Sequence, residues 1–149
     1  MIQVPSSIYI EKNLTGLIAN QLMAKYQRPV LLLNEVRNVE YATDAKGNKI
    51  VMFDWISWEG SARGYDKSTL TDFRKFCLDT NKVLYAEGHA NAFGFGIKDI
   101  EVNAFIEYTN FALRDCTFEP CYHVDFIFSA DDFNGNDVIE IAELKHLWG

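Results

Sequence analysis

The amino-acid sequence predicts an α/β fold, with a mixed central β-sheet, helices packed on it and a C-terminal strand–helix extension. Short apolar runs typical of strands alternate with segments in which apolar residues recur at helical spacing. The run VLLL at residues 30–33 directly follows such a helical segment and is typical of a strand buried on both faces. A chain of 149 residues, 48% of them hydrophobic, is long enough to bury a core of its own.

The first half of the chain is predicted to contain a strand, a helix and then further strands. The apolar run at residues 8–10 predicts a short strand, and Pro29 ends the helix that follows it. Strands are expected at residues 30–34, 50–55 and 58–64, with a turn at the DAKGNK cluster of residues 44–49. The helix is predicted from apolar residues at helical spacing, which are Leu14, Leu17, Ile18, Leu22 and Tyr26.

The second half of the chain alternates helices and strands. A helix over residues 68–81 is expected to start at Ser68, a residue type that caps helices well. Strands are predicted at residues 83–89, 92–97 and 122–130, a helix at 99–115 and a short helix at 138–149. The apolar faces of the first two helices are Leu70, Phe73, Phe76 and Cys77, and then Val102, Phe105, Ile106, Thr109 and Leu113.

The charge and cysteine content narrow the class of protein. A formal net charge of −7 and a pI near 4.9 argue against a broadly basic, nucleic-acid-coating surface, but they allow a small positive pocket. The three cysteines form no CxxC pair, so we expect reduced thiols in a cytoplasmic setting. The sequence shows neither a signal-peptide pattern nor an apolar run near the roughly 20 residues that cross a bilayer. We therefore expect a soluble, cytoplasmic protein with no membrane partner.

The stretch EGHANAFGFG, Glu87 to Gly96, places His89 among small residues. An imidazole in this setting could act as a base, a metal ligand or a phosphate donor, or it could be a hydrogen-bonded core residue. His123 and His146 share no metal-ligand spacing with it, and no serine or cysteine has a recognisable nucleophile motif. Phosphate donation fits best, because glycine neighbours let the backbone approach an anion closely.

Two other segments combine small residues with a possible anion contact. Arg63 lies in the stretch WEGSARG, where its guanidinium suits phosphate or carboxylate, unless it is a surface arginine paired with Glu59 or Asp66. Gly16 stands near a predicted helix start, where backbone N–H groups can hold an anion. For Gly16 the residues favour the plainer interpretation, which is close packing of the helix against the sheet.

Taken together, these segments resemble the DHH-associated C-terminal domain of DHH-superfamily phosphoesterases, and most closely that of RecJ-type single-stranded-DNA exonucleases. Three blocks stand in the order typical of that family over most of residues 8–115. They are GLIANQLMAKYQRPVLLL, GSARG and GHANAFGF. The matching positions are Gly16, Ala19, Arg28, Pro29, Gly60, Ser61, Arg63, Gly88, His89, Ala92, Gly94 and Phe95.

The resemblance implies a division of the chain and a set of site residues. Residues 1–118 would form the DHH-associated substrate-binding domain, and residues 119–149 would begin a strand–helix region that leads to an OB-like domain. The implied phosphate-binding residues are Arg63, His89, Gly88, Ser61 and Asn91, and the implied supporting residues are Gly60, Gly94, Gly16 and Arg28.

The chain also departs from the family pattern at two positions. Glu87 stands where the family usually has a glycine, and Phe93 where it usually has an alanine. A carboxylate at position 87 should weaken anion binding in the implied pocket. Phe93 and Trp58 could stack on bases, although both are expected to belong to the core.

The resemblance also implies partners. In this family an N-terminal domain holds Mn²⁺ or Mg²⁺ with Asp and His residues, and the metals activate the attacking water. Its Asp-His-His motif is absent from this sequence. We therefore expect no catalytic residue, metal or cofactor in this chain, which should be inactive alone. The expected partners are single-stranded nucleic acid or a nucleotide phosphate, and the DHH domain of the same protein. The alternatives are the substrate domain of a small-oligonucleotide or cyclic-dinucleotide phosphodiesterase, and a non-enzymatic binding or interaction module.

Overall fold

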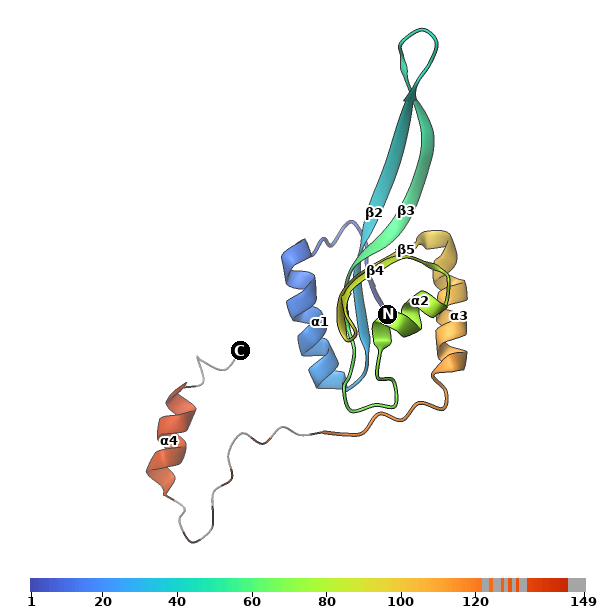
Figure 1. Ribbon diagram of the computed structural model, residues 1–149. Helices are drawn as coiled ribbons and strands as arrows, with labels where there is room; N and C mark the ends of the chain where they lie inside the picture. The colour runs from blue at the N-terminus through green and yellow to red at the C-terminus, as the bar shows by residue number, and fades with distance from the viewer. Residues whose placement is uncertain (122–123, 125–126, 128, 130, 132–133, 145–149) are drawn as a thin grey trace.

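A computed structural model describes residues 1–121, 124, 127, 129, 131 and 134–144 (Figure 1). Its centre is one five-stranded sheet in the order β1-β2-β3-β5-β4. The strands are β1 (Ile2–Val4), β2 (Val30–Thr43), β3 (Lys49–Arg63), β4 (Val83–His89) and β5 (Ala92–Lys98). β1 runs parallel to β2 and every other pair is antiparallel, so the predicted mixed sheet of an α/β fold is confirmed.

Helices cover both faces of the sheet (Figure 1). Helix α1 (Lys12–Tyr26) packs on one face, and α2 (Phe73–Asp79) and α3 (Val102–Ala112) pack on the other, with the 3-10 turn η1 (Asp99–Glu101) leading into α3. The core under α1 consists of Val4, Ala19, Val30 and Leu32. The larger core consists of Leu31, Leu33, Trp58, Ala62, Phe73, Cys77, Ala86, Phe93, Phe95, Ile97, Val102 and Phe105.

Successive residues of β2 alternate between these two cores, as expected of a strand covered on both sides. Leu32 faces α1, whereas Leu31 and Leu33 face α2 and α3. The interpretation of VLLL as a doubly buried strand is thus confirmed. The strand is longer than predicted, because it continues to Thr43.

β2 and β3 extend past the rest of the sheet as a long hairpin (Figure 1). Only residues 57–63 of β3 pair with β5, so the outer part of the hairpin has no second neighbour in the sheet. The predicted turn is confirmed at its tip, where the Asp44 carboxylate accepts hydrogen bonds from the N–H groups of Lys46 and Asn48. Apolar residues on this arm are exposed: Tyr41, Ile50, Val51, Met52 and Phe53.

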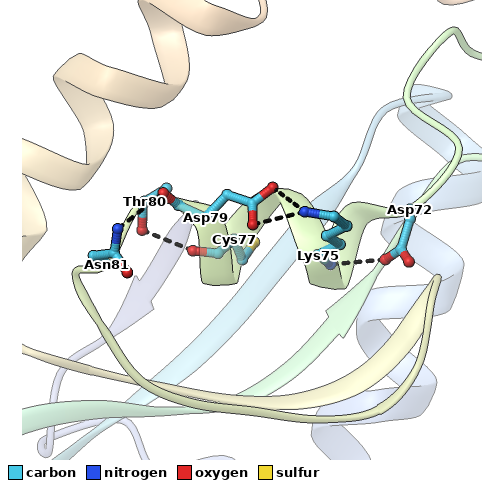
Figure 2. A network of polar contacts seen from close by, with 6 residues as sticks. All are labelled: Asp72, Lys75, Cys77, Asp79, Thr80 and Asn81. Atoms are coloured by element: carbon cyan, nitrogen blue, oxygen red, sulfur yellow. Dashed lines mark hydrogen bonds and ion pairs between the residues drawn. The ribbon is translucent and has the colours of Figure 1, made fainter.

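The predicted helix of residues 68–81 is shorter than expected, and Ser68 is not its cap. Figure 2 shows that Asp72 caps α2 by accepting the backbone N–H of Lys75, whose ammonium pairs with Asp79 four residues from it. Ser68 instead donates its hydroxyl to the carbonyl of Tyr65 and pairs with Phe118. The helix therefore starts at Asp72, four residues after Ser68, where the side-chain carboxylate caps it.

The strand predicted at residues 8–10 is wrong, because the N-terminal strand is β1 instead. The side-chain amide of Asn34 accepts the N–H of Ile10 and donates to its carbonyl. The Ile10 backbone is satisfied by this side chain and needs no strand partner. The face predicted for α1 is also partly wrong. Leu14 and Leu17 are exposed, and Thr15 and Ala19 are the buried residues.

The C-terminal predictions are only partly covered by the described residues. Most of the strand predicted at residues 122–130 lies outside them, and the described positions 124, 127 and 129 are not in a strand. The predicted helix is present as α4 (Gly135–Glu143), capped by Asn134, and residues 145–149 lie outside the description. The predicted boundary after residue 118 stays a prediction. The backbone is tied to the body up to Cys121, whose carbonyl accepts from Gln27.

The three cysteines differ in environment, which gives a first test of the fold. Cys77 is fully buried, and burial raises the pKa of its thiol to about 12, whereas Cys116 and Cys121 are half-buried. Because the thiolate is the reactive form, a thiol reagent at about pH 8 should label Cys116 and Cys121 in the folded protein and spare Cys77. Mass spectrometry of the digested protein measures this. Rapid labelling of Cys77 without denaturant would show that the core around α2 is not packed as described.

Candidate functional site

Helix α1 covers part of one face of the sheet, and the part that it leaves uncovered is here called the open face. Because side chains alternate along a strand, every second residue of β3, β5 and β4 lies on this face. In the register, Arg63 of β3 lies opposite Ala92 of β5, which lies opposite His89 of β4. Two strand spacings, about 9–10 Å, therefore separate the backbones of Arg63 and His89. Both side chains stand on the same face, on either side of Ala92.

A surface pocket of about 280 Å³ lies at this end of the open face. It brings together the predicted residues Arg63, from the end of β3, and His89 and Asn91, from the turn between β4 and β5. The complete lining is Asn20, Met23, Arg63, Gly64, Asp66, His89, Asn91 and Ala92.

Gly16 makes room for the guanidinium of Arg63. A Cβ atom at position 16 would lie 2.6 Å from Arg63 Nη2, so any larger residue would push that group away. Gly16 lies in the second turn of α1, four residues after Lys12, where its N–H belongs to the helix. The packing interpretation of Gly16 is thus confirmed, and its role in the site is to admit Arg63.

Arg63 has donors available for a ligand. Its Nη1 donates to the carbonyl of Ala62, which holds the guanidinium in place, and among the described residues it has no carboxylate partner. The two acids that sequence reasoning offered as partners are engaged elsewhere. Glu59 accepts from Tyr85 and Ser57, and Asp66 accepts from Asn91.

The polar chain around Glu59 occupies the middle of the open face. The hydroxyl of Tyr85 donates to Glu59 Oε2 at 3.1 Å, and Ser57 donates to Oε1 at 2.8 Å. Burial, and then the negative charge of Glu59, raises the pKa of Tyr85 to about 12, so the phenol stays protonated. Its ring lies so close over Gly96 that a Cβ there would be 2.3 Å from it.

His89 stands at the end of β4, before the tight turn at residues 90–91 that leads into β5. It is exposed, and its side chain makes no hydrogen bond within the described part of the chain. Gly88 before it has a φ of +136°, and a Cβ there would lie 2.8 Å from the carbonyl oxygen of Ala92. Only glycine suits this position, and the conformation sets His89 at the pocket rim.

Ser61 and Asn91 are held by the fold itself. The Ser61 hydroxyl lies 2.9 Å from that of Thr15, which donates to the carbonyl of Lys12, so the Ser61 proton points to Thr15. Asn91 Oδ1 accepts the N–H of Phe73, and its Nδ2 donates to Asp66. The predicted phosphate contacts of both residues stay predictions, and their observed bonds position α1 and the loop after β3.

Of the predicted supporting residues, Gly60 and Gly94 lie in the sheet beside the pocket, whereas Arg28 lies elsewhere. Gly60 is needed where β2 and β3 pair, because a Cβ would lie 2.1 Å from the carbonyl oxygen of Leu32. Gly94 has room for a Cβ, whose nearest neighbour would be 3.7 Å away. Arg28 is not in this pocket. Its guanidinium stacks on Phe118 at 4.7 Å, and it lines a separate apolar groove beside α3.

The two departures from the family pattern have different consequences. Phe93 is buried and packs edge-on against Phe73, and Trp58 is buried and donates to Asp99, so both belong to the core as expected. Glu87 is exposed on the open face, in the row next to His89, and lies opposite Gly94. The carboxylate thus stands beside the pocket rather than in it.

Sequence reasoning did not include Asn20, Met23, Gly64 and Asp66 in the pocket. Asn20 follows Gly16 by four residues, so helical spacing places both on one face of α1 and could have indicated it. No group of three or more His, Cys, Asp or Glu in the described part of the chain could hold a metal ion. None of the described helices is long and apolar enough to cross a membrane.

No protein-family model and no solved structure matches the chain. Over 147 residues, 95% of this chain, it is 36% identical to YorK of Bacillus subtilis (strain 168), named as an SPbeta prophage-derived single-strand DNA-specific exonuclease. The same figures hold for the protein of Bacillus phage SPbeta that is named as a single-strand DNA-specific exonuclease. The chain spans 23% of the length of each relative, so its similarity is to one part of proteins so named.

Proposed function

We propose that this chain is the substrate-binding domain of a RecJ-type single-stranded-DNA exonuclease of the DHH phosphoesterase class. The observation that carries the proposal is the pocket in which Arg63 and His89 face each other across Ala92, with no carboxylate bound to either among the described residues. The names of the two relatives agree with a single-stranded DNA substrate.

In this proposal the pocket binds one phosphate of the strand. Arg63 donates from its guanidinium, and His89 donates from its ring, to phosphate oxygens between them. Gly16 lets the guanidinium lie against α1, and the Ser61–Thr15 bond fixes α1 on β3 beside it. The Asp66 carboxylate at the pocket wall is bound to Asn91, which holds it within the loop.

Hydrolysis belongs to a separate DHH domain in this proposal. That domain would hold the Mn²⁺ or Mg²⁺ ions, which supply the activated water, and this chain would present the phosphate to it. A net charge of −7 repels a polyanion outside the pocket, so binding by this chain alone should be weak. Because the binding itself is a contact between cationic groups and phosphate, it should fall with added salt.

A titration followed by amide chemical shifts tests the proposal. Single-stranded oligodeoxynucleotide added to the isotope-labelled chain should shift the amides of Gly16, Arg63, His89 and Ala92 before those of α3. Duplex of the same sequence and a cyclic dinucleotide serve as comparisons. Saturation of these amides by the cyclic dinucleotide at lower concentration than by the strand would favour the small-substrate alternative. Absence of shifts at Arg63 and His89 with every ligand would favour an interaction module.

A further inference from the structure

A second pocket, of about 870 Å³, lies where the long hairpin leaves the sheet beside the end of β5. Its lining combines an aromatic ring with charged groups: Ser6, Glu35, Arg37, Asp54, Trp55, Ile56, Lys98, Asp99 and Ile100. The volume is in the range of pockets that hold small molecules such as nucleotides.

Trp55 offers an aromatic surface to this pocket. The residue is half-buried, but its Nε1 is fully buried and has no hydrogen-bond partner within the described residues. The exposed part of the side chain is therefore carbon, and an exposed indole ring is a surface on which a base can stack. Trp58, by comparison, is buried, and its indole N–H donates a hydrogen bond to Asp99 at 2.6 Å.

Lys98 is the cation left available at this place. Its Nζ lies 5.8 Å from the centre of the Trp55 ring, and it has no ion pair among the described side chains. The neighbouring charges are engaged, because Arg37 binds Asp54 with its Nε at 2.9 Å and Asp99 accepts from Trp58. Glu35 lies opposite Trp58 in the register, so its side chain is on the face that carries α2 and α3 and not on the face of Lys98.

Trp55 and Lys98 lie on the same face of the sheet as the first pocket, whereas Arg37, Asp54 and Ile56, like Glu35, belong by strand alternation to the other face. Ser57, which pairs with Lys98, is six residues from Arg63 on β3, and Trp55 is two residues further on the same face. At strand spacing Arg63 is roughly 20 Å from Ser57 and roughly 26 Å from Trp55, a span that a few nucleotides of an extended strand cover. Between them β5 presents Gly94 and Gly96, and the ring of Tyr85 lies over Gly96.

The middle of this path has carboxylates but no cation. Glu87 is exposed there, and Glu59 is bound to Tyr85. A strand that follows the path would therefore be held at its ends, at Arg63 and His89 on one side and at Lys98 and Trp55 on the other.

We propose that Trp55 and Lys98 form a second nucleotide subsite, in which a base stacks on Trp55 and Lys98 contacts the adjoining phosphate of the strand. This inference rests on the proposed function, because it is the strand held at Arg63 and His89 that reaches the second subsite. The subsite makes affinity depend on length: a dinucleotide fills the first pocket alone, and a decanucleotide fills both.

Affinity measurements with single-stranded dinucleotide and decanucleotide on the full chain test the subsite. Lys98→Ala should weaken decanucleotide binding about 3- to 10-fold, and Trp55→Leu about 5- to 100-fold, with dinucleotide binding unchanged for both. The Trp55 indole N–H resonance should shift with the decanucleotide and not with the dinucleotide. Lys46→Ala removes an equal charge at the exposed hairpin tip and should leave both affinities as in the wild type.

The outcomes separate this inference from the proposed function. If the wild type binds both ligands and Lys98→Ala and Trp55→Leu bind the decanucleotide equally well, the second subsite is disproved and the first pocket stands. If the wild type binds neither ligand, the proposed function fails and the subsite with it. Lys98 is exposed, so its variant keeps the test valid even if Trp55→Leu unfolds.

Discussion

Gly60→Ala should destabilise the fold by about 1–3 kcal/mol, the usual cost of forcing an extra carbon into a well-packed site. The new methyl group would lie 2.1 Å from the carbonyl oxygen of Leu32, which is backbone in the neighbouring strand and has no flexible end that can move aside. β2 and β3 would have to separate where they position Ser61 and Arg63. For a chain of this size the melting temperature should fall by roughly 2–12 °C.

Gly94→Ala is the matched control for this prediction. Gly94 lies on β5, next to β3, and a Cβ there would meet no atom closer than 3.7 Å. Alanine also restricts the unfolded chain, so this variant should be as stable as the wild type or more stable by about 0.4–1 kcal/mol. Urea unfolding of both variants measures the difference. Equal midpoints for Gly60→Ala and Gly94→Ala would mean that the β2–β3 approach at Gly60 is not the constraint described here.

Arg63→Ala should weaken the binding of single-stranded DNA about 10- to 150-fold, because a charge-assisted hydrogen bond contributes about 1.5–3 kcal/mol. The half-buried guanidinium has no acidic partner in the described structure, so its removal should leave the stability close to that of the wild type. The slope of log affinity against log salt should also decrease by about 0.7, the value for one phosphate contact on a single strand. Fluorescence anisotropy at several salt concentrations measures both quantities.

Two further variants make the Arg63 result specific. Arg114→Ala removes the same charge from an exposed position beside Asp115, and it should change neither the affinity nor the salt slope. Gly16→Ala keeps the arginine but places a methyl group 2.6 Å from its Nη2, so it should displace the guanidinium and weaken binding in the same direction. If Arg63→Ala binds as the wild type does, or loses binding only because it unfolds, the pocket is not the phosphate site.

The chain's local patterns predicted most of its elements. Helical spacing before Pro29 and at residues 99–115, the buried run after Pro29 and the glycine-rich pair of strands all correspond to elements of the structure. Two of the errors occurred where a side chain took over backbone hydrogen bonding. Asn34 satisfies Ile10 outside a strand, and Asp72 rather than Ser68 starts α2. Such partners are distant in sequence or equivalent by residue type, so local patterns do not reveal them.

By itself the sequence determined most of the helices and strands, though not β1 or the full length of β2, and it identified Arg63, His89 and Gly16 as candidate residues of one site. The tertiary structure decided what each one touches. The register of β3, β5 and β4 places Arg63 and His89 on either side of Ala92, and α1 brings Gly16 against the guanidinium. Arg28, from the same sequence block as Gly16, stacks on Phe118 instead. The physical reason is that propensity and spacing are local, whereas a side chain's partners depend on strand register and on helix packing against the sheet.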